Sequence, residues 1–200
     1  VSSGAGTNQV DIGQSANNGV QDQNALVSQT GDANTVTIEQ SQVLSLAGED
    51  ASVTQVGATN IATIVQSGSG SLATVSQTGD GSTYTVTQRG DNNIATSVRT
   101  GSGDTMTINQ YSAGNSSVIT GAGSFNTITV LQELRDGNIS NIGQDGSDNI
   151  ADVIQNASTA STSTITQGGN FNVATITQST VGGTSTVTQA GSYNTATVSQ

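Results

Sequence analysis

The side chains of this 200-residue chain that could do chemistry are almost all carboxylates. The sequence has 14 Asp and Glu residues and three Arg residues, and it has no His and no Cys. Without His or Cys, the common zinc centres, thiol nucleophiles and Ser-His-Asp triads cannot form. Asp145 and Asp148 could form the carboxylate pair of a hydrolase, but only 2% of the residues are aromatic and could line a pocket. We therefore expect no catalysis, no cofactor and no metal centre.

Most of the acidic residues fall in expected turns, which leaves two interpretations open. Weak cation binding is one, although the Gly-Gly-x-Gly-x-Asp nonapeptides of calcium-binding solenoids are absent. The sequence favours the other, in which these carboxylates are solvated turn charges whose repulsion slows premature assembly. The residues concerned are Asp32, Glu49, Asp50, Asp80, Asp91, Asp136, Asp145 and Asp148.

The charge and hydropathy of the chain bound its partners. A formal net charge of −11 argues against nucleic acid and against anionic membrane surfaces. The sequence has no apolar run long enough to span a bilayer, so we expect no membrane insertion. Residues 1–4 lack the charged and apolar regions of a signal peptide, as they would in a mature chain from which such a peptide had been removed.

Glutamine recurs along the chain at a fixed spacing, which marks an internal repeat. Seventeen positions continue the series, and 15 of them are Gln. Of the 16 steps between them, 12 are 11 residues long, two are 12 and two are 15. The series runs Gln14, Gln29, Gln40, Gln55, Gln66, Gln77, Gln88, Arg99, Gln110, Gly121, Gln132, Gln144, Gln155, Gln167, Gln178, Gln189 and Gln200.

The segment before each of these positions alternates between polar and apolar residues. Residues 34–40 (NTVTIEQ) and 172–178 (NVATITQ) are examples. Thr, Val and Ile with a period of two are typical of β-strands. The alternation places Asn, Ala or Val, Ile or Val, and Gln on one face, and Thr and Ser on the other.

A glycine lies two residues after every second position of the series, so the true repeat is about 22 residues long. We expect each repeat to run strand, Gly turn, strand and looser turn. The Gly turn would need a positive φ or a close backbone approach, both of which Gly accepts at low cost. These turn glycines are Gly31, Gly57, Gly79, Gly101, Gly123, Gly146, Gly169 and Gly191.

Strand–turn units of 11 residues are too short to hold a crossover helix. We therefore predict an all-β fold, a two-sheet parallel β-solenoid of about eight 22-residue strand-turn-strand repeats that is cross-β and stacks into a fibre. Residues 1–200 would form one repeat domain, with repeats beginning near residues 29, 55, 77, 99, 121, 144, 167 and 189. Residues 99–143 are degenerate, because Arg99 and Gly121 replace Gln there.

Buried amides need hydrogen-bond partners, and stacking them at the strand spacing lets each one bond the copies above and below. We predict such a structural ladder. Its members would be Gln29, Gln55, Gln66, Gln77, Gln88, Gln144, Gln155, Gln167, Gln178, Gln189, Asn34, Asn60, Asn93, Asn149, Asn172 and Asn194.

The two ends of the sequence follow the same strand pattern. Residues 8–14 and 194–200 both begin with Asn and end with Gln, and neither contains the Pro or Lys that blunts edge strands. We expect open edges at both ends of the solenoid. Contact between opposite ends does not close on itself, so it would generate a filament.

The pattern Gln-x-Gly-x-x-Asn followed by x-Ala-x-x-x-Gln resembles the curlin repeat of bacterial curli fibre subunits. It is complete in residues 55–66, 144–155, 167–178 and 189–200, with near matches beginning at Gln29 and Gln88. The resemblance implies an extracellular functional amyloid of the biofilm matrix. It also implies secretion through an outer-membrane pore and growth from a nucleator subunit at the cell surface. The even repeats favour the major subunit over the nucleating one, without deciding between them.

We thus expect a secreted structural protein of a curli-like cell-surface fibre that serves adhesion and surface attachment, with copies of itself as its main partner. The alternative is an ice-binding β-solenoid. Thr-x-Thr recurs along the chain, as in the flat Thr arrays of such proteins, at residues 35–37, 85–87, 105–107, 127–129, 164–166, 175–177 and 186–188. Thr is also a favoured exposed strand residue, and Ser, Ile and Val interrupt its rows.

Overall fold

The alternating segments of Thr, Val, Ile and Ser form short strands, and the Gly-rich segments between them form corners. The structure, a computed structural model, describes residues 2–3, 6–16, 23–42, 47–156 and 159–200. Its strands assemble into two sheets of nine strands each, and every pairing is parallel.

Successive strands alternate between the two sheets, which we call sheet A and sheet B. Sheet A contains β1 (Ser2–Ser3), β3 (Asn24–Thr30), β5 (Asp50–Val56), β7 (Leu72–Thr78), β9 (Ile94–Thr100), β11 (Ser116–Ala122), β13 (Ile139–Asp145), β15 (Thr162–Gly168) and β17 (Thr184–Ala190). Sheet B contains β2 (Gln9–Ala16), β4 (Thr35–Gln42), β6 (Ile61–Ser67), β8 (Thr83–Arg89), β10 (Thr105–Gln110), β12 (Thr127–Glu133), β14 (Ile150–Asn156), β16 (Val173–Gln178) and β18 (Thr195–Ser199).

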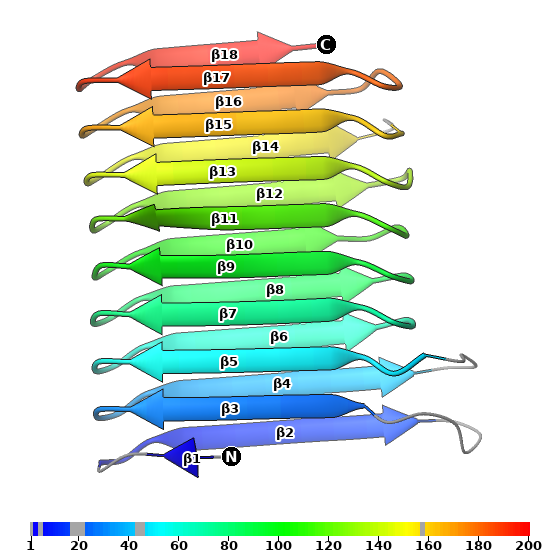
Figure 1. Cartoon of the computed structure of the whole chain (residues 1–200), viewed down its shortest axis with the longest axis vertical. Helices are drawn as coiled ribbons and strands as arrows, with labels where there is room; N and C mark the ends of the chain where they lie inside the picture. The colour runs from blue at the N-terminus through cyan, green and yellow to red at the C-terminus, as the bar shows by residue number, and fades with distance from the viewer. Residues whose placement is uncertain (1, 4–5, 17–22, 43–46, 157–158) are drawn as a thin grey trace.

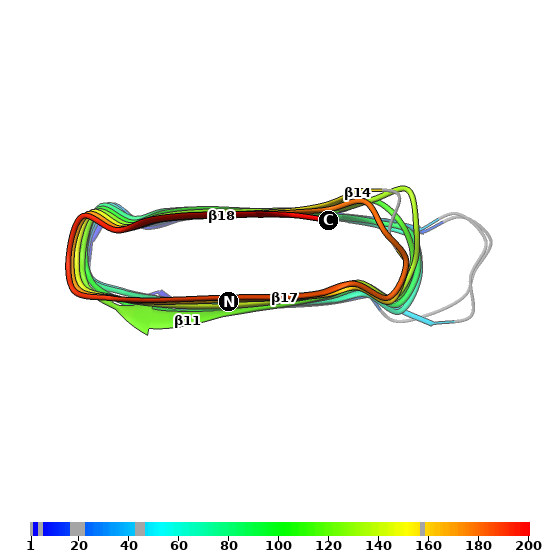
Figure 2. The same cartoon turned by 90° about the horizontal axis from the view of Figure 1, so that it is seen from above.

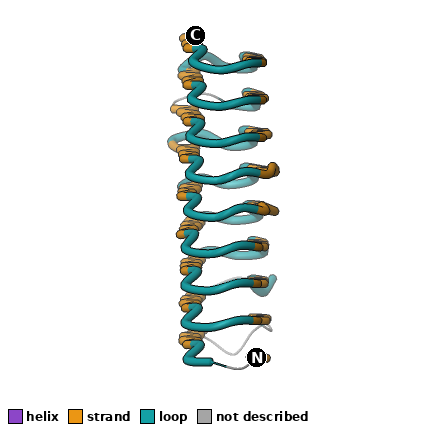
Figure 3. The backbone as a smooth tube through the Cα atoms, turned by 90° about the vertical axis from the view of Figure 1, so that its left-hand side faces the viewer, coloured by secondary structure: helices purple, strands orange, loops and turns teal. Residues whose placement is uncertain are grey.

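The chain winds as a flattened coil. Each strand pairs with the strand two places later in the sequence, so one coil lies on the next from the N-terminus to the C-terminus (Figure 1). Seen along the stack, the coils superpose on a narrow ring whose long sides are the two sheets (Figure 2). The side view shows that the layers are evenly spaced (Figure 3). This arrangement confirms the prediction of an all-β, two-sheet parallel β-solenoid.

The register between layers places like residues on like residues. Ile38 pairs with Ile64 in sheet B, and Val53 pairs with Val75 in sheet A. These aliphatic side chains point between the sheets, where they are fully or almost fully buried. Because the side chains alternate, the Thr residues of the strands point outward from both sheets. The expectation that Ser shares this outer face is wrong at several strand positions, such as Ser97 and Ser163, whose side chains are buried between the sheets. The described part of the chain contains no helix that is long and apolar enough to cross a membrane.

Candidate functional site

The most regular polar feature of the interior is a column of stacked Gln side chains in sheet B. From Gln14 to Gln155, each side-chain Nε2 donates to the Oε1 of the Gln in the next layer, at 2.7–2.9 Å. These donors all point towards the C-terminal layers. The Nε2 of Gln178 donates instead to the Oγ of Ser185 and the carbonyl of Thr162. The column consists of Gln14, Gln40, Gln66, Gln88, Gln110, Gln132, Gln155 and Gln178.

Each Gln also binds the backbone of the facing sheet. Besides its bond to Gln88, the Nε2 of Gln66 donates to the carbonyl oxygens of Asp50 and Ser71, both at 3.1 Å. Asp50 begins β5 of sheet A, so the amide of a sheet B residue ties the two sheets together. Buried amides that are bonded along and across the stack fix the register and leave few donors unpaired.

The corresponding column of sheet A has the same polarity but is interrupted. Gln29 donates to Gln55, and Gln55 donates to Gln77, at 2.9 and 2.7 Å. The column resumes with Gln144, Gln167 and Gln189, joined at 2.7 and 2.8 Å. In the part of the chain that the structure describes, the Oε1 atoms of Gln29 and Gln144 have no donor, because neither has a Gln in the preceding layer.

The Asn residues stack differently from the predicted amide-to-amide ladder. The Oδ1 of Asn34 accepts the backbone N–H of Asn60 at 3.0 Å, and its Nδ2 donates to the carbonyl of Gly57 at 2.7 Å. Asn126, Asn149 and Asn172 make the same pair of bonds, and Asn60 matches them with Ser82 as the N–H donor. The Asn side chain is one methylene shorter than Gln and lies next to the corner, so it reaches the backbone of the next coil. At the last layer the Nδ2 of Asn194 donates to the Oδ1 of Asn172 at 2.9 Å.

One predicted ladder position, Asn93, makes only part of these contacts. Asn93 keeps half of the pattern, because its Oδ1 accepts the N–H of Asn115 at 3.0 Å. Its Nδ2 is buried and finds no acceptor among the described residues. At the Asn93 position the preceding layers carry Ser71 and Glu49 instead of Asn.

The corner glycines combine the two features that the sequence suggested, a positive φ and a close approach to the backbone of the next coil. Gly57 has φ +119°, and a Cβ atom there would lie 2.1 Å from the carbonyl oxygen of Gly79 in the next coil. At Gly101 the φ is +144° and the corresponding distance is 1.6 Å. The tight stacking of one corner on another thus excludes any side chain. All eight predicted turn glycines have positive φ.

The gap in the sheet A column is filled by a buried ion pair. Arg99 stands at the Gln position, Asp104 stands at an Asn position of sheet B, and both side chains are 1–2% exposed. Their Nη2 and Oδ1 atoms are 3.5 Å apart. The Nη1 of Arg99 donates to the backbone carbonyl of Gln144, two layers on, at 3.4 Å. A Cβ at Gly121 would lie 3.0 Å from that Nη1 and 1.9 Å from the same carbonyl oxygen, so only Gly leaves room for the guanidinium.

This pair was not predicted, although the sequence carries a signal for it. Gln and Asn are five residues apart in the repeat, as in Gln29 and Asn34, and Arg99 and Asp104 have the same separation. Opposite charges that replace both amides of one repeat could have been recognised as partners. Asp104 keeps part of the Asn role, because its Oδ1 accepts the N–H of Asn126 at 2.9 Å.

The acidic residues that were expected in turns have two environments, and two of them, Asp50 and Asp145, lie at the ends of strands. Asp32, Asp50, Asp80, Asp91, Asp136, Asp145 and Asp148 are exposed. Asp80 and Asp145 accept the N–H groups of Ala58 and Ala122 in the preceding coil, at 2.7 and 3.0 Å. The described ranges contain no cluster of three or more Asp or Glu residues that could hold a metal ion.

For Glu49 the expectation of a solvated turn charge is wrong. Its side chain is 0% exposed, and in the described structure neither carboxylate oxygen has a hydrogen-bond partner. Burial, and to a lesser extent the negative charge of Asp91, raises the pKa of Glu49 to about 7. Glu49 occupies an Asn position of sheet A directly before β5, where the alternation of side chains along the strand sets its inward direction.

Glu49 should make the stability of the solenoid depend on pH. Its pKa is about 7 in the folded chain and 4.5 without the protein environment, so folding favours the protonated form. Stability is therefore highest below about pH 4.5 and falls as the pH rises towards 7. At pH 8 we expect Glu49→Gln to raise the free energy of unfolding by about 2–3 kcal/mol and to leave it nearly unchanged at pH 4. Denaturant unfolding at both pH values measures this.

The exposed neighbour of Glu49 provides the control. Asp50→Asn removes the same charge at the first residue of β5, where the side chain is solvated. We expect this variant to keep the pH dependence of the wild type. Equal effects of the two substitutions at pH 8 would attribute the dependence to net charge and contradict the role of the buried carboxyl.

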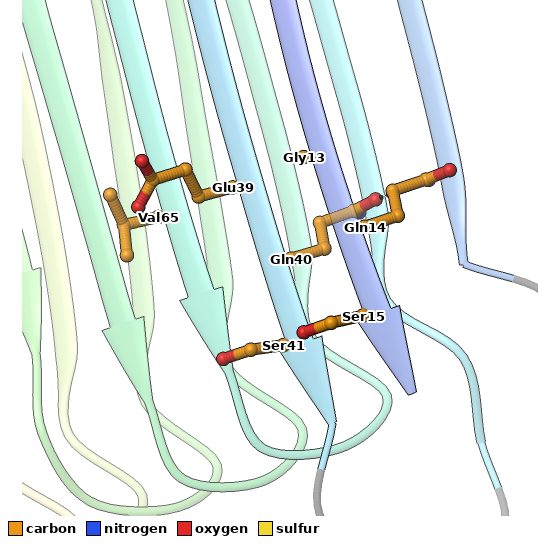
Figure 4. Close-up of a pocket in the computed structure, with 7 residues that line it drawn as sticks. All are labelled: Gly13, Gln14, Ser15, Glu39, Gln40, Ser41 and Val65. Atoms are coloured by element: carbon orange, nitrogen blue, oxygen red, sulfur yellow. Dashed lines mark hydrogen bonds between the residues drawn. The ribbon is translucent and has the colours of Figure 1, made fainter. Parts of the chain in front are cut away.

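The outer faces of the sheets carry the Thr rows and two shallow depressions. Thr85, Thr107 and Thr129 lie in register on sheet B, but Asp152 continues that row in β14. A depression of about 330 Å³ lies over Gly13, with Glu39 and Val65 on the following strands (Figure 4). A second depression, of about 220 Å³, lies over Gly143 on sheet A. Each marks an outward position at which a strand has Gly in place of a side chain.

One comparison with known proteins bears on this arrangement. The family model of the Curlin associated repeat matches residues 50–79. This stretch contains β5, β6 and β7, the corner Gly57, and the stacked residues Gln55, Gln66 and Gln77. No curated protein matches the chain significantly.

The match confirms the resemblance over these residues, and the curlin repeat family is structural, not catalytic. The matched stretch has the same strand, Gly corner and strand as the coils on either side of it. Residues 50–79 of this β-solenoid therefore match the Curlin associated repeat in sequence.

Proposed function

We propose that this chain is a structural subunit of an extracellular curli-like amyloid fibre, in which solenoids stack end to end. The fibre would belong to a biofilm matrix and serve adhesion and surface attachment. The curlin repeat at residues 50–79 supports this proposal, as do the stacked Gln columns.

The observation that carries the proposal is the match between the first and last layers of sheet B. Residues 8–14 and 194–200 both place Asn, a small or β-branched residue, a β-branched residue and Gln at the inward positions. Among the described strands, β2 pairs only with β4, and β18 pairs only with β16. Strand edges of this kind add further strands through their free backbone groups.

The polarity of the Gln column also suits this junction. From Gln14 to Gln155, each Nε2 of the column donates towards the C-terminal layers, so the first layer offers the Oε1 of Gln14 as an acceptor. Gln200 stands at the corresponding position of the last layer, and its Nε2 donates to the carbonyl of Thr184. A second copy placed below would continue the column from Gln200 to Gln14 without a change of direction. The partner of the chain is then a further copy of itself.

Secretion, a nucleator subunit and a secretion pore follow only from the curlin resemblance. They complete the proposal as a secreted, cell-surface fibre. Fibre formation by the purified 200-residue chain tests its central part. We expect unbranched fibres whose diffraction has a meridional reflection near 4.7–4.8 Å. A chain that stays monomeric at high concentration, or assembles without this reflection, would contradict the proposal.

Gln189→Ala should slow the elongation of such fibres. The Nε2 of Gln167 donates to the Oε1 of Gln189, and the Nε2 of Gln189 donates to the carbonyl of Val173. Removing the side chain takes one of its two acceptors from the buried amide of Gln167, which keeps only the carbonyl of Ile150, at a cost of about 1–3 kcal/mol. Seeded thioflavin kinetics measure the elongation rate, with Gln9→Ala as the control because Gln9 is exposed on β2. Equal rates for Gln189→Ala and the wild type would count against a role of the column in growth.

The in-register Thr residues of sheet B support ice binding as a second candidate function. Thr83, Thr105 and Thr127 flank the row of Thr85, Thr107 and Thr129, which makes a regular array over three strands. Thermal hysteresis of the soluble chain would support this candidate. Fibre formation without hysteresis would remove it.

A further inference from the structure

The outer face of sheet A is free of charge over most of its area. Each sheet A strand from β3 to β17 has four outward positions. The second and third of these positions form two rows that run across the sheet. In these described strands the two rows hold no charged residue. The rows are Leu26, Ser52, Thr74, Thr96, Val118, Asn141, Thr164 and Thr186, and Ser28, Thr54, Ser76, Val98, Thr120, Gly143, Thr166 and Thr188.

The outer face of sheet B differs. Its middle rows include the acidic residues Asp11, Glu39 and Asp152. Its fourth outward row adds Arg89 and Glu133. On sheet A the only charged outward residues of the described strands are Asp50 and Asp145, at the first and last positions of their strands. In a chain with a net charge of −11, two copies approach with least repulsion through the outer face of sheet A.

This face also exposes more apolar surface. Leu72, Ile94 and Ile139 lie in its first row, and Val98 and Val118 lie near its centre, each 36–49% exposed. The depression of about 220 Å³ over Gly143 lies beside them, bordered by Val118 and Thr120. The face therefore combines exposed aliphatic side chains with a hollow that an aliphatic side chain from another copy can enter.

The size of the face is sufficient for a stable contact. Eight strands at about 4.8 Å spacing and about seven residues at 3.3 Å each give roughly 900 Å² per copy. Two such faces bury about 1,800 Å² in total, which is within the range of a standard specific interface. The face is also flat and continuous along the stack, so solenoids that stack end to end would extend it.

We propose that copies of this chain pair laterally, face to face, through the outer surface of sheet A. The partner is a second copy of the same solenoid. The pairing deepens the end-to-end stacking proposed above, because stacked solenoids would pair along their whole length. It makes the filament two solenoids thick and leaves the acidic outer face of sheet B towards solvent on both sides.

Lysine substitutions on the two outer faces test the pairing. Thr96→Lys places a charge in a middle row of sheet A, between Thr74 and Val118. Thr107→Lys makes the same change in a middle row of sheet B, between Thr85 and Thr129. Both variants have the same net charge, and circular dichroism checks that both keep the fold. Electron microscopy measures filament width, and sedimentation of the soluble chain measures dimerisation.

We expect wild-type and Thr107→Lys filaments to be two solenoids wide and Thr96→Lys filaments to be one solenoid wide. We expect Thr96→Lys to weaken dimerisation of the soluble chain about 100-fold, because an unpaired charge is buried in the interface. Wild-type filaments of single width, pairing that persists in Thr96→Lys, or loss of pairing in Thr107→Lys would each overturn the proposal. Absence of filaments would contradict end-to-end stacking instead, and sedimentation would still decide the pairing.

Discussion

Gly57→Ala is expected to lower the free energy of unfolding by roughly 3–5 kcal/mol. Gly57 has φ +119°, and an added Cβ would lie 2.1 Å from the carbonyl oxygen and 2.7 Å from the carbonyl carbon of Gly79. Both neighbours are backbone atoms of the next coil, so no side chain can rotate away. The corners would have to separate, which would also weaken the hydrogen bond from the Gly79 N–H to the carbonyl of Val56. Chemical denaturation measures the change.

Gly143→Ala is the matched control for this prediction. Gly143 points outward from β13, its φ is not positive, and no described atom lies within 4 Å of an added Cβ. We expect its free energy of unfolding to stay the same or to rise by about 0.5 kcal/mol. If both variants lose stability equally, the corner contact between coils is not what requires Gly57.

Arg99→Gln is expected to destabilise the solenoid by about 3–5 kcal/mol. The substitution leaves the carboxylate of Asp104 buried without its cation, and the Oδ2 of Asp104 already has no hydrogen-bond partner in the described structure. The new Gln would also find no amide at Gly121 in the next layer. Thermal or denaturant unfolding of the purified variant measures the loss.

The double variant Arg99→Gln/Asp104→Asn separates charge from packing. It removes the stranded carboxylate and restores the amides of the regular repeat, with the Asn able to donate to a corner carbonyl as Asn126 does to Gly146 at 2.9 Å. We expect it to recover at least about 2 kcal/mol of the loss. A double variant no more stable than Arg99→Gln alone would show that the cost comes from the lost side-chain volume.

Much of the fold could be predicted because the repeat encodes the same information many times. A single strand of alternating Thr, Val and Ile is ambiguous. Its recurrence with Gln at a fixed position requires equivalent residues to stack, and the pairing of Gln66 with Gln88 is one of many that follow. The exclusion of side chains from the corners was likewise encoded by the glycines at every second turn, as at Gly57 and Gly79.

Several features could not be read from the repeat because they depend on which atoms the corners bring together. The sequence placed Asn34 in an amide ladder, but its position next to the corner directs its amide to the backbone carbonyl of Gly57. It also placed Glu49 in a solvated turn. The alternation of side chains along β5 already includes Glu49, the residue directly before the strand, so its carboxyl points inward.

By itself, the sequence determined the strands, their parallel stacking and the identity of the residues that lie on one another, because each coil repeats the preceding one. The tertiary structure decided where that repetition fails. Arg99 lies in β9 and Asp104 directly precedes β10, and the turn of the chain from one sheet to the other brings their side-chain N and O atoms to 3.5 Å. The charge-free outer face of sheet A has the same origin, since it emerges only when residues about 22 positions apart are placed side by side.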